Sequence, residues 1–182
     1  MAENTTENHQ KSSKITLRTI ELSDIDDFMV WATDDRVSQY CIWDTHTSKD
    51  QALDFIKNNA MPHPWFRVIC VENRAVGSIS VSPNSGNDSC RGELGYVLAY
   101  EHWGKGIATK AVKMVVSSIF QEWPHLERLE AYVDANNKGS QRVVEKAGFI
   151  REAVLRKHRI IKGISRDMVV FSILSSDQHL DS

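Results

Sequence analysis

The stretch Gly95-Tyr-Val-Leu-Ala-Tyr-Glu-His-Trp-Gly-Lys-Gly-Ile-Ala-Thr109 decides the fold expected of this chain. A β-rich run leads through two closely spaced glycines, Gly104 and Gly106, directly into a segment of helical periodicity. Free backbone N–H groups at a helix N-terminus lie at the positive end of the helix dipole, and glycines let an anion approach the backbone closely. The stretch therefore predicts a strand, an anion-binding loop and a helix, in that order.

Three other interpretations of the glycine loop compete with this one. A P-loop is excluded, because Ala99 stands where its first glycine belongs and Gly106 where a Ser or Thr would ligate Mg²⁺. A dinucleotide fingerprint is disfavoured, because Thr109 takes its third position and the preceding strands resemble an antiparallel meander. A tight turn at a helix start, with no ligand, is left open by the loop alone.

The segments before the loop predict a strand, two helices and a meander. Alternating apolar residues over 14–20 indicate a strand, and Ser23 is predicted to cap the helix that follows. Ser48 is predicted to cap a second helix that ends near Ala60. The β-rich runs 66–71, 75–81 and 91–99 are separated by turn residues and predict three antiparallel strands.

The segments after the loop predict a helix, a strand, a helix and a closing hairpin. These elements cover residues 107–120, 129–133, 139–147 and 149–174, with the hairpin turning at Lys162-Gly163. A meander combined with crossovers requires a mixed sheet, so the expected class is α/β or α+β.

Composition indicates one domain without a polyanionic partner. The 182 residues include 22 Lys or Arg and 24 Asp or Glu, so no net field attracts nucleic acid or a membrane surface. We expect polar tails at 1–13 and 176–182 around a single domain at 14–175. No run approaches the roughly 18 apolar residues of a membrane span, and no secretory signal is visible, so a cytoplasmic location is expected.

The cysteines predict neither a disulfide framework nor a metal site. Cys41, Cys70 and Cys90 are odd in number and lack CxxC spacing.

The glycine loop and two later motifs together resemble the GCN5-related N-acetyltransferases. Gly104-Lys-Gly-Ile-Ala-Thr109 is followed by Asn137-Lys-Gly-Ser140 and by Glu145-Lys-Ala-Gly148-Phe149, in the family's order. Further matches indicate the RimJ/RimL-like branch, which acetylates N-terminal amines of ribosomal proteins. They are Leu17-Arg18, Ser23-Asp24, Trp31, Glu152 to Arg156, Gly163 and Asp167.

The resemblance implies a mixed, mostly antiparallel sheet of six or seven strands with about four flanking helices. The sheet would part between its fourth and fifth strands, where the pantetheine arm of acetyl-CoA would lie, and no metal would be needed. The pyrophosphate would be bound by backbone N–H groups of Trp103, Gly104, Lys105, Gly106, Ile107, Ala108 and Thr109. Glu101 replaces the family's usual Gln or Arg and is expected to point away.

The resemblance also implies the groups that handle the thioester. The oxyanion would be held by a backbone N–H of Val97, Leu98 or Ala99. Ser140 would give a proton to the leaving thiolate, unless it only caps its helix. Asn137 would bind the pantetheine amide, unless it is only a turn residue.

The general base is open between Glu93 and Glu130, either of which would act through water if burial raised its pKa. Strand alternation leaves open that Glu130 lies on a solvated face. Arg159 occupies a place where some relatives carry a glutamate.

The expected function is transfer of the acetyl group of acetyl-CoA to a primary amine, through a ternary complex. The acceptor would be a protein N-terminus or a small molecule, and the enzyme a monomer or a homodimer. A CoA-binding regulatory or sensor module without catalysis is the alternative. A protein-interaction domain that binds no CoA ester is a third class, which Gly104, Gly106 and Asn137 disfavour.

Overall fold

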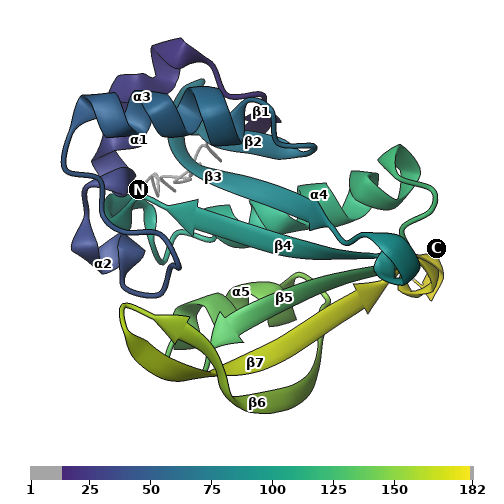
Figure 1. The fold of residues 1–182 in the computed structure, drawn as a ribbon. Helices are drawn as coiled ribbons and strands as arrows, with labels where there is room; N and C mark the ends of the chain where they lie inside the picture. The colour runs from purple at the N-terminus through teal and green to yellow at the C-terminus, as the bar shows by residue number, and fades with distance from the viewer. Residues whose placement is uncertain (1–13, 181–182) are drawn as a thin grey trace, which may run out of the picture.

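A seven-stranded mixed sheet forms the centre of the protein, shown here as a computed structural model that describes residues 14–180 (Figure 1). The strand order is β1-β2-β3-β4-β5-β7-β6, and all neighbours are antiparallel except β4 and β5. The strands are β1 (Ile15–Arg18), β2 (Phe66–Val71), β3 (Arg74–Pro83), β4 (Arg91–Leu98), β5 (Arg128–Asp134), β6 (Ile150–Ile161) and β7 (Ile164–Leu174). The predicted mixed, mostly antiparallel sheet is confirmed.

The helices form two layers, one on each face of the sheet. They are α1 (Ile25–Ala32), α2 (Asp35–Ser38), α3 (Lys49–Phe55), α4 (Ile107–Glu122) and α5 (Lys138–Lys146). A π-helical turn, η2 (Ile56–Ala60), extends α3, and the 3-10 turns are η1 (Leu22–Asp24), η3 (Gly86–Asp88), η4 (Tyr100–His102) and η5 (Ser175–Leu180). None of the helices within 14–180 has the length and apolar character that crossing a membrane requires.

Each helical layer buries its own apolar cluster. On one face, Trp31 of α1 and Ile56 of η2 pack with Val68 of β2. On the other face, Val112 of α4 packs with Leu129 and Phe171 from β5 and β7. Because successive side chains of a strand point to opposite faces, Val97 joins the first layer while Leu98 joins the second.

The sheet parts between β4 and β5, as predicted. Parallel pairing joins Arg91 to Arg128, Gly92 to Leu129 and Glu93 to Glu130, and the ladder ends there. On the other side of β4, pairing with β3 continues as far as Gly77 opposite Leu98. The C-terminal ends of β4 and β5 therefore diverge, as Figure 1 shows.

The entry into α1 differs from the prediction. Ser23 does not cap a helix, because η1 begins after Glu21 and α1 only at Ile25. The carboxylate of Asp24 accepts from the Glu21 N–H at 2.8 Å and from Arg18 at 2.6 Å, which winds this segment into a 3-10 turn. The predicted cap at Ser48 is confirmed, since its hydroxyl accepts from the Gln51 N–H at 3.3 Å.

Gly77 should be essential for the β3–β4 pairing beside the parting. A Cβ at this position would collide with the Val97 carbonyl and lie 2.9 Å from Leu98 Cα. We expect Gly77→Ala to lower the free energy of unfolding by about 1–3 kcal/mol, measured by urea denaturation. Gly95→Ala is the matched control, because its Cβ would meet Ser80 Oγ at an ordinary 3.5 Å. Equal stability of the two variants would contradict this view of the strand pair.

Candidate active site

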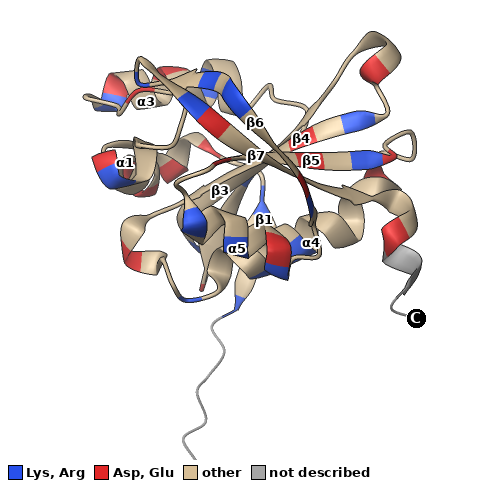
Figure 2. Ribbon diagram, turned by 90° about the horizontal axis from the view of Figure 1, so that it is seen from below, with Lys and Arg blue, Asp and Glu red and all other residues tan. Residues whose placement is uncertain are grey.

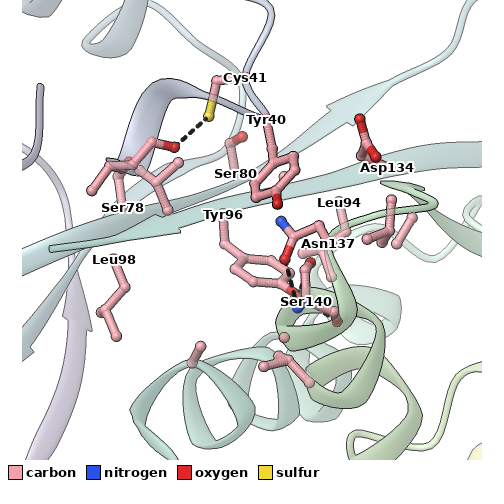
Figure 3. Close-up of a pocket in the computed structure, with 18 of the residues that line it drawn as sticks. Tyr40, Cys41, Ser78, Ser80, Leu94, Tyr96, Leu98, Asp134, Asn137 and Ser140 are labelled. Carbon is pink, nitrogen blue, oxygen red and sulfur yellow. Dashed lines mark hydrogen bonds between the residues drawn. The ribbon is translucent and has the colours of Figure 1, made fainter. Parts of the chain in front are cut away.

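A cavity of about 1010 Å³ opens where β4 and β5 part. The glycine loop, the start of α5 and side chains under the α1–α3 layer all line it. Figure 3 shows Tyr96, Leu98 and Ser140 on one side of the strands, with Tyr40, Cys41 and Ser80 on the other. The cavity therefore has two halves that meet at the opening in the sheet.

The backbone of β4 presents polar groups without a strand partner to the opening. The Ala99 N–H donates to the Val76 carbonyl of β3 at 2.8 Å, so the odd-numbered residues direct their backbone toward β3. Even-numbered residues consequently direct theirs toward β5, from which β4 has separated. The oxyanion is predicted to be held by the N–H of Val97, Leu98 or Ala99. Of these three, the Leu98 N–H faces the opening, whereas the Ala99 N–H is paired with β3.

The glycine loop has the geometry of an anion site. Gly104 and Gly106 have φ values of 73° and 75°, and Gly106 immediately precedes α4. A Cβ at either position would meet nothing within 4 Å, so the left-handed backbone and not crowding requires glycine. The first N–H groups of α4, from Ile107 to Thr109, have no partner within the helix and lie along the cavity.

Trp103 braces the loop instead of offering its backbone. Its N–H donates to the Tyr100 carbonyl at 3.0 Å, so the predicted use of this N–H for an anion is wrong. Its indole Nε1–H donates to the Leu98 carbonyl at 2.7 Å and ties the loop to β4. Lys105 is exposed, and Glu101 pairs with His102 at 3.2 Å with 67% of its side chain exposed.

The start of α5 adds basic side chains that sequence reasoning missed. Lys138, Arg142 and Lys146 all line the cavity, and Figure 2 shows basic residues along this helix. Their spacing of four residues places them on one helical face. This spacing is visible in the sequence and could have predicted a basic face on the helix. Asn137 caps the helix by accepting from the Ser140 N–H at 3.1 Å.

A half-buried hydroxyl pair lies beside the opening. Tyr96 Oη and Ser140 Oγ are 2.6 Å apart, and Tyr96 Oη also donates to the Ser140 carbonyl at 3.1 Å. Burial raises the pKa of Tyr96, so the phenol stays protonated at neutral pH. Because Asn137 is the cap, the alternative that Ser140 only caps its helix is wrong. Sequence reasoning missed Tyr96, although its alternation with Leu98 places both toward α4 and α5.

Glu130 belongs to an ionic network at the closed end of the parting. It is 4% exposed, so the alternative of a solvated face is wrong. It accepts from Arg128 at 2.6 Å, from Tyr132 at 3.1 Å and from Arg91 at 3.3 Å. Burial raises its pKa, but the hydrogen bonds from Arg128 and Tyr132 outweigh burial, and the net pKa is lowered. The condition on which Glu130 was a candidate base, a pKa raised by burial, is therefore not met.

Glu93 is the more accessible of the two glutamates. It lines the cavity, 38% of its side chain is exposed, and its Oε1 lies 3.2 Å from Arg159 Nη1. The Arg159 guanidinium also lies 5.5 Å from the centre of the Tyr132 ring. The arginine therefore connects the β6–β7 hairpin to both parting strands.

Comparison with protein families identifies the chain. The acetyltransferase (GNAT) domain family matches residues 14–150. The probable N-acetyltransferase YjcK of Bacillus subtilis is 41% identical over 106 residues, which cover 58% of this chain and 58% of that protein.

Solved structures share the fold along nearly the whole chain. A GNAT-family acetyltransferase from Bacillus anthracis has a TM-score of 0.79 at 24% identity, covering 89% of this chain and 96% of that one. RimJ from Mycobacterium smegmatis, in complex with CoA-disulfide, has a TM-score of 0.77 at 23% identity, covering 92% and 84%. The predicted fold and the resemblance to the GCN5-related N-acetyltransferases are confirmed.

Glu130 should stabilise the fold in a pH-dependent manner. Its folded-state pKa lies below the ordinary 4.5, so its stabilisation is present above that value and is lost as the pH falls through the folded pKa. We expect Glu130→Gln to lower the free energy of unfolding by about 1–3 kcal/mol at neutral pH, and by less in acid. Urea denaturation over a pH series measures this, with the exposed Glu145→Gln as control. A loss independent of pH would contradict the assignment.

Proposed function

This chain belongs to the GNAT family of acetyltransferases, and we propose that it transfers the acetyl group of acetyl-CoA directly to a primary amine in a ternary complex. One observation carries the proposal: a single cavity joins the glycine loop, with its anion-site geometry, to the half-buried Tyr96–Ser140 hydroxyl pair at the opening of the sheet. The acceptor is a protein N-terminus or a small-molecule amine.

The residues present fit acetyl-CoA. The N–H groups from Gly104 to Thr109 would hold the pyrophosphate, and the basic face of α5 would add positive charge for the phosphates. The backbone groups of β4 that face the opening would pair with the pantetheine arm as a strand would. Since Asn137 Oδ1 accepts from Ser140, its Nδ2 group is the donor for a pantetheine carbonyl.

The chemistry requires three actions from this chain. The acceptor nitrogen bonds to the acetyl carbon while the carbon–sulfur bond breaks. The Leu98 N–H would stabilise the oxyanion, and Ser140 would give its proton to the departing sulfur. Glu93, which lines the cavity, would accept the proton of the amine through water.

A second candidate function is a CoA-binding sensor without catalysis. The contact between Glu93 and Arg159 favours it, because an ion pair opposes the protonation that a general base must undergo. We also propose that residues 14–175 form a single domain, that the protein is cytoplasmic, and that it is a monomer or a homodimer.

The glycine loop should determine affinity for acetyl-CoA. Alanine costs roughly 1–2 kcal/mol in the left-handed region, so Gly104→Ala/Gly106→Ala should weaken binding about tenfold or more in calorimetry. Gly86→Ala is the matched control, because Gly86 has a φ of 62° with equal free space but lies in η3. Equal weakening by both changes would refute a specific role of the loop.

Ser140 should matter for turnover more than for binding. General acid catalysis typically contributes about 10²–10⁴-fold, so Ser140→Ala should lower kcat by a factor in that range. Amine-dependent release of free thiol measures kcat, and calorimetry should show acetyl-CoA affinity within about threefold of wild type. Tyr96→Phe, which keeps the ring, should cause a smaller loss. If wild type binds acetyl-CoA but releases no thiol with any amine, the sensor replaces the transferase.

A further inference from the structure

The half of the cavity opposite the hydroxyl pair is walled by aromatic rings. We call it the aromatic chamber and define it by Phe28, Trp43, His46, Phe55 and Phe66, all of which line the cavity. The Phe28 and Phe55 rings stack with centroids 5.6 Å apart, and His46 meets them edge-on at 5.7 and 5.8 Å. Burial lowers the pKa of His46, so this ring is neutral at physiological pH. The chamber therefore presents a largely uncharged, aromatic wall.

Gly95 lies at the floor of the chamber, where the absence of a side chain leaves space, although its backbone conformation does not require glycine. Gly95 pairs with Ser80, and both face the chamber. Gly95 does not have a positive φ, and a Cβ there would meet Ser80 Oγ at an ordinary 3.5 Å. Glycine within a strand costs roughly 0.5–1 kcal/mol relative to alanine, and it commonly marks close approach by a ligand. Its place in β4, directly beside the parting, puts that ligand next to the opening.

The cavity lining offers few carboxylate oxygens that an amine could bind. Across residues 14–180 the acids that line it are Glu93 and Asp134, and Glu93 already contacts Arg159. Asp134 is 3% exposed; its Oδ1 accepts from the Asn136 N–H at 2.7 Å, while its Oδ2 is buried without a hydrogen-bond partner. Arg166 Nη1 forms an ion pair with Asp134 Oδ2 at 3.8 Å, a separation too long for a hydrogen bond, so Oδ2 keeps its capacity to accept one. A buried carboxylate oxygen in this state suits one amine donor, whereas a polyamine needs several carboxylates.

The rim of the chamber is tied across its outer side. Lys162, at the tip of the β6–β7 hairpin, donates to the Trp43 carbonyl and to Asp44 Oδ1, the latter at 2.9 Å. The bridge joins two segments that line the cavity, the loop at Trp43 and the hairpin at Ile161. A compact acceptor fits under such a bridge better than a polypeptide, which needs an open path for its chain.

We propose that the acceptor is a small monoamine with an apolar, ring-sized body, which fills the aromatic chamber above Gly95 while its amine donates to Asp134 Oδ2. This proposal rests on the transferase function and narrows its acceptor class. Asp134 binds and positions the amine, and Gly95 sets the size of the body that fits.

The test compares four amines as acceptors: 2-phenylethylamine, n-propylamine, spermidine and a short peptide with a free N-terminal alanine. Thiol release gives kcat/KM, and calorimetry gives binding of each amine to the CoA-loaded protein. Burying a ring should favour 2-phenylethylamine over n-propylamine by about tenfold or more.

The variants test the two residues separately. Gly95→Val should reduce kcat/KM for 2-phenylethylamine by about tenfold and for n-propylamine by much less, with acetyl-CoA affinity nearly unchanged. Asp134→Asn keeps the Oδ1 acceptor for Asn136 and should raise KM for both monoamines. Ser165→Val, at an exposed position of β7 that does not line the cavity, is the control for a bulky β-branched side chain added to a strand.

The outcomes separate this proposal from the transferase function. Faster turnover of spermidine or the peptide than of 2-phenylethylamine overturns the acceptor class and leaves the transferase intact. Equal effects of Gly95→Val on both monoamines overturn it as well. If no amine causes thiol release, but 2-phenylethylamine binds and Gly95→Val abolishes this binding, catalysis is rejected. The aromatic chamber is then supported as a binding site for the amine. If the protein neither binds 2-phenylethylamine nor acetylates it, the proposal is rejected.

Discussion

The short parallel ladder between β4 and β5 is the constraint on which the rest of the structure depends. Backbone pairing that ends at Glu93 and Glu130 leaves the following residues of β4 with polar groups directed into an opening. In a continuous sheet, a neighbouring strand forms hydrogen bonds with such groups. The opening therefore suits an extended ligand that carries amide groups. The close contact of Gly77 with the β4 backbone keeps the other side of that strand fixed.

The closed end of the parting is held by charge. Arg91 and Arg128, which pair across the parallel ladder, both donate to Glu130, and Arg128 also pairs with Glu152. Hydrogen bonds from Arg128 and Ser172 lower the pKa of Glu152 to about 2. One network thus links the two parting strands to the closing hairpin. Because Glu130 is engaged in these ion pairs, it is better suited to stabilising the fold than to transferring a proton.

The sequence alone predicted the elements that depend on local signals. It did not predict features that depend on contacts between residues distant in the chain. The glycine loop, the cap at Ser48 and the closing hairpin follow from turn chemistry and periodicity. The Tyr96–Ser140 contact joins residues 44 positions apart, so no local pattern reveals it. Glu130 was misjudged because strand alternation tells which side chains share a face but not what covers that face. Ser23 lost its predicted role to Asp24, whose partner Arg18 lies in the preceding strand.

The two halves of the cavity meet from opposite faces of one sheet, and this arrangement bears on the order of events. The glycine loop lies at the start of α4, whereas the aromatic chamber is lined by side chains of α1 and α3. A ligand in one half does not have to pass a ligand in the other half to reach the opening, so the architecture imposes no sequence of arrival or departure. A molecule that occupies one half of the cavity leaves the other half free, so it would compete with one substrate and inhibit non-competitively toward the other.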